Sequence, residues 1–323
     1  MPIHNPGYRP WHGQTAPLAT RWVVIAEVGI RRAWLSSWLR RMMFFAWLPA
    51  CVMGFMVFLY EQTSANDPTA ARTMLGMSRM LIEPGSSASD SFADLETLMD
   101  RRKQSPERER HLYWSALLTT LFRRSQPFIL IPMLGIIVPP LISQDFRSRA
   151  FLLYFSRPIT RLQYILGKAA CVMFFAATVT FGPAILLFIT AVLLSPSLTV
   201  LGSTWDLSLR IVAASLSIIV PCTCLSLMLS SLASESRYAS FSWFAIWIFG
   251  ELAWATVSQA ATVGNNVVIS CLSLIRVFND VTAWILDPEL VVNDIQTRLV
   301  LLASISAVSL AVLYRRVSAP LQV

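Results

Sequence analysis

The sequence predicts an all-α integral membrane protein with six transmembrane helices. Hydrophobic residues make up 55% of the 323 positions and charged residues only 14%, whereas a soluble domain carries about 25% charged residues. The apolar residues gather in long runs, and many of the cations flank those runs. We therefore assign the net charge of +8 mostly to membrane edges. A nucleic-acid partner is not expected, because the arginines do not gather on one soluble face.

The chain before the first apolar run divides into two parts. Residues 1–20 contain prolines, glycines and polar groups without the apolar core of a signal peptide, so we expect a flexible N-terminal tail. Residues 21–41 mix tryptophans with arginines. Both residue types favour the headgroup region, so 21–41 is predicted to be an amphipathic connecting helix that lies in the membrane interface.

Residues 42–323 are predicted to form the six-helix transmembrane domain. The expected spans cover residues 42–60, 127–142, 160–194, 207–233, 241–259 and 297–314. Prolines occur inside the first four spans, and Pro139-Pro140 should bend the second span close to its end. The third span is long enough to begin outside the membrane.

Two segments between the spans are too polar or too broken to cross a membrane. Residues 61–125 contain both charge signs and two stretches with a helical pattern, which predicts a small extracytoplasmic helical insertion. Residues 260–296 are semi-apolar and are interrupted by glycine, asparagine and proline. Such a segment could enter the outer leaflet as re-entrant helices only where protein shields its backbone.

The distribution of arginine and lysine predicts the orientation. These cations crowd before the first span, between the second and third spans, and after the sixth span. Short loops that are rich in arginine and lysine stay on the cytoplasmic side. Both termini are therefore expected in the cytoplasm.

The most informative segment is Ser143–Lys168, between the second and third spans. Proline at position 158 restricts Arg157, the residue before it, and so ends any helix that precedes the pair. Thr160 and Gln163 are spaced as a capping box that begins the next helix. Within the segment, apolar residues recur at i, i+4, i+7 and i+8, which predicts one face of a short amphipathic helix: Phe146, Ala150, Leu153 and Tyr154.

This order resembles the permease subunits of ABC-2-type ABC transporters. The resemblance rests on Arg157-Pro158-Ile159-Thr160-Arg161, then Tyr164, then Gly167-Lys168, placed between the second and third spans. It implies a fold like that of type V exporters, in which residues 143–159 form a cytoplasmic coupling helix. It also implies re-entrant helices before the sixth span. A first outer loop as long as 61–125 departs from many members of that family.

The resemblance also implies the partners. The sequence has no GxxxxGK[ST] phosphate loop, so ATP and Mg²⁺ are expected on a separate ATPase chain, and no cofactor is expected in this one. Six helices are half of the usual twelve-helix core, which implies a homodimer or a dimer with a similar permease, surrounded by membrane lipids. The implied activity is export of an unidentified substrate across a bacterial cytoplasmic (inner) membrane.

The residues expected to couple the permease to its ATPase lie in the same segment. Aromatic side chains would fill a cleft in the ATPase, and charged side chains would surround that contact. The predicted coupling set is Asp145, Phe146, Arg147, Arg149, Phe151, Tyr154, Arg157, Pro158 and Arg161. A basic loop that serves only to orient the protein is the plainer alternative.

Glu251 is an acidic residue deep inside a predicted span. A carboxyl group at such a depth is expensive and usually faces protein or a cavity. Two interpretations remain open: a residue of the substrate path or gate, and a group hydrogen-bonded to a neighbouring helix. Trp247 and Trp254, on the same aromatic span, are candidates for an apolar substrate path, although packing or lipid contact explains them more simply.

Other functional classes have weaker support. The sequence lacks HExxH and GxSxG motifs, so an intramembrane enzyme is not expected. Its five cysteines and three histidines do not have the spacing of metal ligands. The remaining alternative is an ATP-independent membrane channel or scaffold, which would not need the motif between residues 157 and 168. Stoichiometric co-purification of an ATPase would separate the two classes.

Overall fold

The fold is helical throughout the part of the chain that the computed structural model describes, which comprises residues 20–63, 68–81, 100, 104–148, 159–196, 199–260, 267–287, 289–290 and 292–318. Six stretches in that part are long and apolar enough to cross a membrane: Ser37–Gln62, Pro106–Arg147, Arg161–Leu194, Val200–Leu232, Ser236–Gln259 and Ile295–Ser318. The predicted all-α class with six spans is therefore confirmed.

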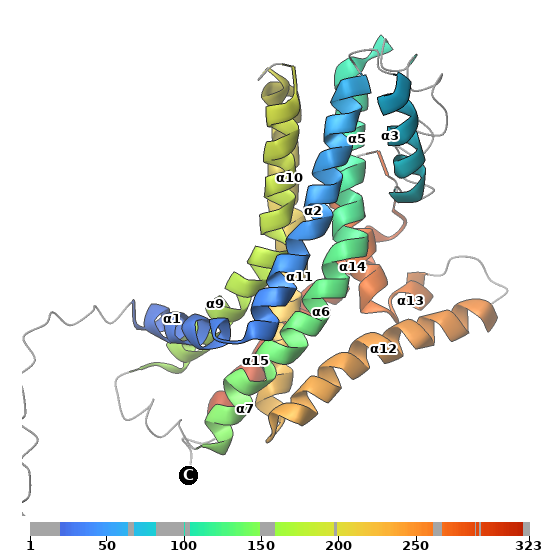
Figure 1. Cartoon of the computed structure of the whole chain (residues 1–323). Helices are drawn as coiled ribbons and strands as arrows, with labels where there is room; N and C mark the ends of the chain where they lie inside the picture. The colour runs from blue at the N-terminus through green and yellow to red at the C-terminus, as the bar shows by residue number, and fades with distance from the viewer. Residues whose placement is uncertain are drawn as a thin grey trace, which may run out of the picture.

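The first helix lies across the direction of the others. Helix α1 (Arg21–Trp34) is transverse, whereas α2 (Ser37–Thr63) runs along the bundle (Figure 1). The Ser36 hydroxyl accepts a hydrogen bond from the Leu39 amide at 3.5 Å, so a polar residue marks the turn between them. The amphipathic helix is consequently shorter than the predicted 21–41, and its last residues belong to α2.

The second span is longer than the sequence predicted. It consists of α5 (Pro106–Thr120), a π-helical turn η2 (Leu121–Ser125), α6 (Gln126–Ile137) and α7 (Pro139–Arg147), so the helix begins well before residue 127. Arginine, serine and glutamine at positions 123–126 interrupt the hydropathy but not the helical backbone. The short helix α3 (Pro68–Leu81) packs beside α2.

Two polar side chains are accommodated where the second and third spans meet. The Gln126 amide donates to the Thr180 carbonyl at 2.9 Å, and Gln126 is buried. Thr180 separates α9 (Arg161–Val179) from α10 (Phe181–Leu194). The break follows from Pro183, which has no N–H to offer the carbonyl of Val179 four residues earlier.

The local signal for the start of the third span is confirmed. The Thr160 hydroxyl accepts from the Gln163 amide, and the Gln163 side chain accepts from the Thr160 amide, which is a capping box. Both hydrogen bonds satisfy amides that have no partner inside the helix. Helix α9 therefore begins at a residue that the sequence alone specifies.

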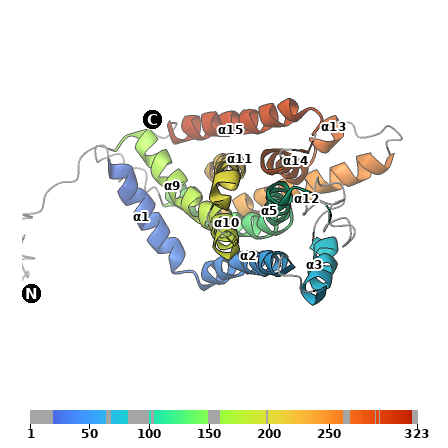
Figure 2. The same cartoon turned by 90° about the horizontal axis from the view of Figure 1, so that it is seen from above.

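Helix α11 (Val200–Leu232) occupies the middle of the bundle. It contacts α7, α9, α10 and the last helix, α15 (Ile295–Ser318), and Figure 2 shows it between α10 and α15. Helix α12 (Ser236–Ala260) runs along the outside, and α13 (Val267–Ser270) and α14 (Leu274–Leu286) follow it. Helix α14 is too short to span a membrane of about 30 Å and packs against α11, α12 and α15. This arrangement shields part of the predicted re-entrant segment.

Two backbone carbonyls of the second span form the attachment points for α12, and a proline frees one of them. Pro139 has no N–H, so the carbonyl of Gly135 loses its helical partner, and the Ser240 hydroxyl of α12 donates to it at 2.9 Å. The Trp243 indole donates to the Ile131 carbonyl at 2.8 Å. A Cβ at Gly135 would lie 2.6 Å from the Phe244 ring, so glycine permits this close approach. The predicted bend of the second span thus binds the fifth span.

A similar close approach holds α1 against α9. A Cβ at Gly167 would lie 2.7 Å from the Ile25 side chain and 2.8 Å from the Trp22 carbonyl oxygen. One turn further along both helices, a Cβ at Gly29 of α1 would lie 3.0 Å from the Cys171 sulfur of α9. Small residues let helix backbones approach closely inside membranes. Gly167 therefore has a packing function at this helix crossing.

We expect Gly167→Ala to loosen α1 and to lower the free energy of unfolding by roughly 1–3 kcal/mol, the usual cost of overpacking. One of the obstructing atoms is the backbone oxygen of Trp22, so a side-chain rotation alone cannot relieve the clash. Thermal unfolding of the purified protein in detergent would measure the effect. Gly202→Ala is the matched control, because a Cβ there would meet no atom within 4 Å. Equal melting temperatures for the two variants would contradict the proposed packing function.

Candidate functional site

A buried ionic cluster joins the end of the second span to the start of the third. We call Asp145, Tyr164 and Lys168 the basic-end clamp, after the arginine-rich end of the bundle where they lie. The Tyr164 hydroxyl donates to Asp145 Oδ2 at 2.8 Å, and Lys168 Nζ lies 2.8 Å from the same oxygen. Lys168 also donates to the Leu141 carbonyl at 2.7 Å. Residues four apart on α7 thus face residues four apart on α9.

The clamp is shielded from solvent. The side chains of Lys168 and Asp145 are only 10% and 13% exposed, and Tyr164 is fully buried. Removing one partner of such a pair leaves a buried charge without compensation, which is far more costly than breaking a surface pair. The two ends of the basic segment between α7 and α9 are therefore rigidly connected.

The predicted coupling residues divide between described and undescribed parts of the chain. Arg149, Phe151, Tyr154, Arg157 and Pro158 lie outside the described residues.

The other four coupling residues lie at the ends of α7 and α9. The Asp145 carboxylate is engaged within the chain, which differs from the contact with a partner that the sequence suggested. Phe146 packs against the core and lies 6.0 Å from the Arg316 guanidinium. Arg147 is exposed at the end of α7, and Arg161 is the first residue of α9. Of the four, Arg147 remains the most accessible to a partner.

Glu251 is paired with a neighbouring helix. Its Oε1 lies 2.8 Å from Arg276 Nη2, and the Ser273 hydroxyl donates to Oε2 at 2.5 Å. The Arg276 guanidinium lies over the Trp254 ring, 2.9 Å from its centre. A Cβ at Gly250 would be 3.0 Å from the Leu272 carbonyl oxygen, so the two segments are in close contact. The carboxylate thus attaches α12 to the start of α14.

A cavity of about 570 Å³ lies beside this pair, between α2, α6, α12 and α14. Both Glu251 and Trp247 line it, among mainly apolar side chains. Trp247 stacks on Phe278 with ring centres 5.9 Å apart, and its indole nitrogen has no hydrogen-bond partner among the described residues. The structure therefore brings two of the three predicted path residues to one apolar cavity, while Trp254 contacts Arg276 instead.

Sequence reasoning did not identify Arg276 and Ser273 as partners of Glu251. They lie more than twenty residues away, on α14 and its cap rather than on α12, so no helical spacing relates them to Glu251. Two signals were present. Arg276 is a cation in a semi-apolar stretch, and an acid inside a membrane span usually pairs with such a partner. Ser273 also caps α14 by accepting from the Arg276 amide.

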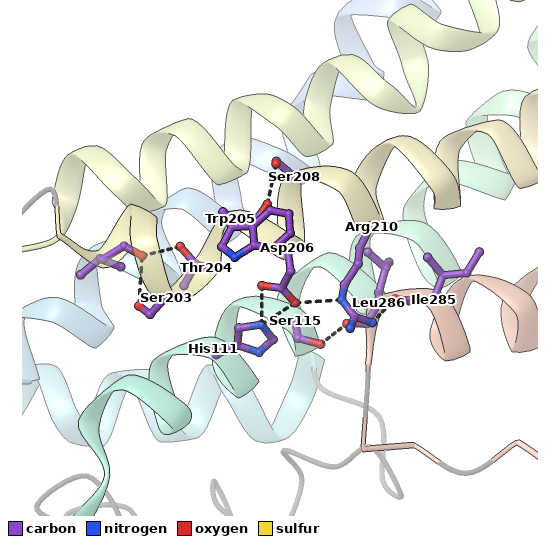
Figure 3. Close-up of polar contacts among 11 residues, drawn as sticks. His111, Ser115, Ser203, Thr204, Trp205, Asp206, Ser208, Arg210, Ile285 and Leu286 are labelled. Carbon is purple, nitrogen blue, oxygen red and sulfur yellow. Dashed lines mark hydrogen bonds and ion pairs between the residues drawn. The ribbon is translucent and has the colours of Figure 1, made fainter.

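A third polar cluster joins α5, α11 and the end of α14, near the end of the second span that is farther from the clamp. Figure 3 shows its side chains. His111 Nε2 is 3.1 Å from each carboxylate oxygen of Asp206, and Arg210 Nε donates to Asp206 Oδ2 at 2.9 Å. Arg210 also donates to the Ile285 carbonyl at 2.8 Å, and the Ser115 hydroxyl donates to the Leu286 carbonyl at 2.7 Å. These contacts hold the end of α14 to α5 and α11.

Comparison with known proteins gives one family. A sequence model described as "ABC-2 family transporter protein" matches residues 31–316. A search among curated proteins found no match for the chain. The matched region includes the basic-end clamp, the pair of Glu251 and Arg276, and the cluster of His111, Asp206 and Arg210.

We expect Asp145→Asn to destabilise the protein by about 3–5 kcal/mol, because Lys168 would stay buried without a counter-charge. Thermal unfolding in detergent would measure the loss. Glu235→Gln, which breaks an exposed pair with Arg237 at the same end, is the control and should cost under about 1 kcal/mol. The double variant Asp145→Leu/Lys168→Met should recover most of the stability. A double variant that loses as much as the sum of its single variants would refute the clamp.

For the second ion pair, we expect Glu251→Arg and Arg276→Glu each to lower the free energy of unfolding by roughly 1.5–3 kcal/mol, the scale of a charged hydrogen bond. The exchanged pair Glu251→Arg/Arg276→Glu should regain much of that loss. Glu289→Arg, at the exposed pair with Arg108, is the control. An exchanged pair no more stable than either single variant would show that the contact does not hold α12 to α14.

Proposed function

Because the chain belongs to the ABC-2 transporter family, we propose that this multi-pass membrane protein is a permease subunit that couples ATP hydrolysis on a separate ATPase chain to export of a substrate. The family match supports a transporter. The geometry of the basic end supports the proposed coupling.

The observation that carries the proposal is the basic-end clamp. Helix α7 ends at Arg147 and α9 begins at Arg161, and the clamp holds these two helix ends together through Asp145, Tyr164 and Lys168. A loop with loose ends would absorb displacement by bending. With rigidly joined ends, a push on this segment displaces α7 and α9 together, as in the rigid-body transitions of switching proteins.

A continuous set of contacts leads from the clamp to the Glu251 cavity. The Ser143 hydroxyl on α7 lies 2.9 Å from that of Ser236, at the start of α12. The Ser230 hydroxyl of α11 donates to the Pro139 carbonyl at 2.7 Å. Helix α12 then carries Trp247 and Glu251 to the cavity of about 570 Å³. In the proposed mechanism, ATPase movement shifts α7, and α12 follows and changes the shape of that cavity.

The mainly apolar lining of the cavity favours a hydrophobic or amphipathic substrate. Glu251 would supply the polar contact that orients it. Trp254 would act through Arg276, by holding the guanidinium that pairs with Glu251.

We propose that the basic end faces the cytoplasm of a bacterial cell, because arginine-rich flanks stay inside. Two copies of the chain, or one copy and a similar permease, would complete the membrane core. Helix α12 supports such a dimer, since only 11% of its most apolar stretch is buried within the chain. Such a helix faces lipid or another subunit.

The proposed ATPase contact predicts that Phe151→Asp weakens co-purification of the co-expressed ATPase by about thirtyfold in affinity, the scale of losing a hot-spot aromatic anchor. Arg157→Ala should retain the complex but reduce the stimulation of ATP hydrolysis by the permease. Arg237→Ala is the matched control, since Arg237 is an exposed arginine in another turn at the same end.

Unchanged assembly and unchanged ATP hydrolysis in both coupling variants would refute the coupling role. If the wild-type membrane protein recruits no ATPase and instead conducts ions in planar bilayers, the ATP-independent channel is the better assignment. A passive complex without either activity would point to a scaffold.

A further inference from the structure

A second and larger cavity, of about 980 Å³, lies at the basic end. It is enclosed by α1, by the junction of α6 and α7, and by the start of α9, and it is separate from the Glu251 cavity. Residues of α1 at positions i, i+4, i+7 and i+11 face it: Arg21, Ile25, Val28 and Arg32. Cations thus lie at both ends of this face, and apolar side chains lie between them.

The wall opposite α1 is mainly apolar. It consists of residues from the junction of α6 and α7: Ile136, Ile137, Pro140 and Leu141. Polar groups gather towards the end of α7, where Gln144, Asp145 and Lys168 complete the lining. The cavity therefore combines a long apolar surface with a polar end.

The charges in the lining favour an anion. Arg21, Arg32 and Lys168 contribute three positive charges and Asp145 one negative charge, a sum of +2. Lys168 and Asp145 compensate each other at 2.8 Å. Arg32 instead donates to the neutral side-chain oxygen of Gln144 at 3.0 Å. A guanidinium has five N–H donors, so this hydrogen bond, the one that Arg32 makes to a described residue, leaves donors for the oxygens of a phosphate.

We propose that this cavity binds an anionic phospholipid from the leaflet at the basic end. Its phosphate would lie against Arg32, and its acyl chains would follow Val24, Val28 and Ile136. The proposal is independent of the coupling to an ATPase. A soluble anion would gain nothing from the apolar walls, whereas a phospholipid matches both parts of the lining. Basic pockets beside membrane helices recognise anionic headgroups in this way.

The position of α1 explains how a lipid would reach the cavity. Helix α1 is transverse to the bundle, as an interfacial helix is, and Val24 and Val28 are 52% and 60% exposed. They are accessible to lipid from the side. The close approach of α1 to α9 at Gly167 keeps α1 in place, so the cavity does not depend on the lipid to hold it open.

Native mass spectrometry of the full-length protein would test the proposal. The protein is purified in detergent and incubated with equal amounts of phosphatidylglycerol and phosphatidylcholine of different mass. We expect wild type to retain phosphatidylglycerol preferentially. Arg32→Gln should reduce that retention about fivefold, the factor expected for one cation near an anionic headgroup. Arg31→Gln is the matched control, because Arg31 is exposed and pairs with Glu27 at 2.6 Å.

A second pair of variants tests the acyl-chain wall. Val28→Glu should also lose phosphatidylglycerol, because it places a negative charge in the cavity. Val23→Glu should not, since Val23 lies on the same helix outside the lining. Both valines are exposed, so neither variant threatens the fold. Equal retention of the two lipids, or equal losses in Arg31→Gln and Arg32→Gln, would overturn the proposal. So would displacement of the bound lipid by millimolar inorganic phosphate, which would show a site for free anions.

Discussion

The structure depends on one buried ionic interaction at the basic end. Lys168 and Tyr164 of α9 share a single carboxylate oxygen of Asp145, at the end of α7. A charged group in a shielded place is tolerated only with a partner in good geometry. The cluster therefore determines how the second and third spans meet, and it fixes the start of α9 between α7 on one side and α1 on the other.

Further contacts extend this constraint through the bundle by using backbone carbonyls at Pro139 and one helical turn before it. The Gly135 carbonyl, freed by Pro139, accepts from Ser240, and the Pro139 carbonyl accepts from Ser230. In a membrane, water cannot satisfy such groups, so a neighbouring helix must do so. Pro139 therefore takes part in both attachments: it frees the Gly135 carbonyl for α12, and its own carbonyl accepts from α11. A mechanical connection from the basic end to Glu251 follows from this chemistry.

The motif that resembles ABC-2 permeases has a structural explanation for several of its residues. Thr160 caps α9, Tyr164 and Lys168 hold Asp145, and Gly167 admits α1. The capping box could be predicted from spacing alone, because both of its hydrogen bonds are local. The function of Gly167 could not, because the atoms that exclude a larger residue belong to a helix more than a hundred positions away.

The sequence by itself determined the helical class, the six spans and the cap of α9, because hydropathy, periodicity and capping act over neighbouring residues. Only the tertiary structure decided the continuation of α5 through positions 121–126, the pairing of Glu251 with Arg276, and the two cavities. Hydropathy ends a predicted span at a polar cluster, whereas a packed bundle can satisfy that cluster, as Thr180 does for Gln126. The partner of a buried charge is likewise set by which helices lie side by side.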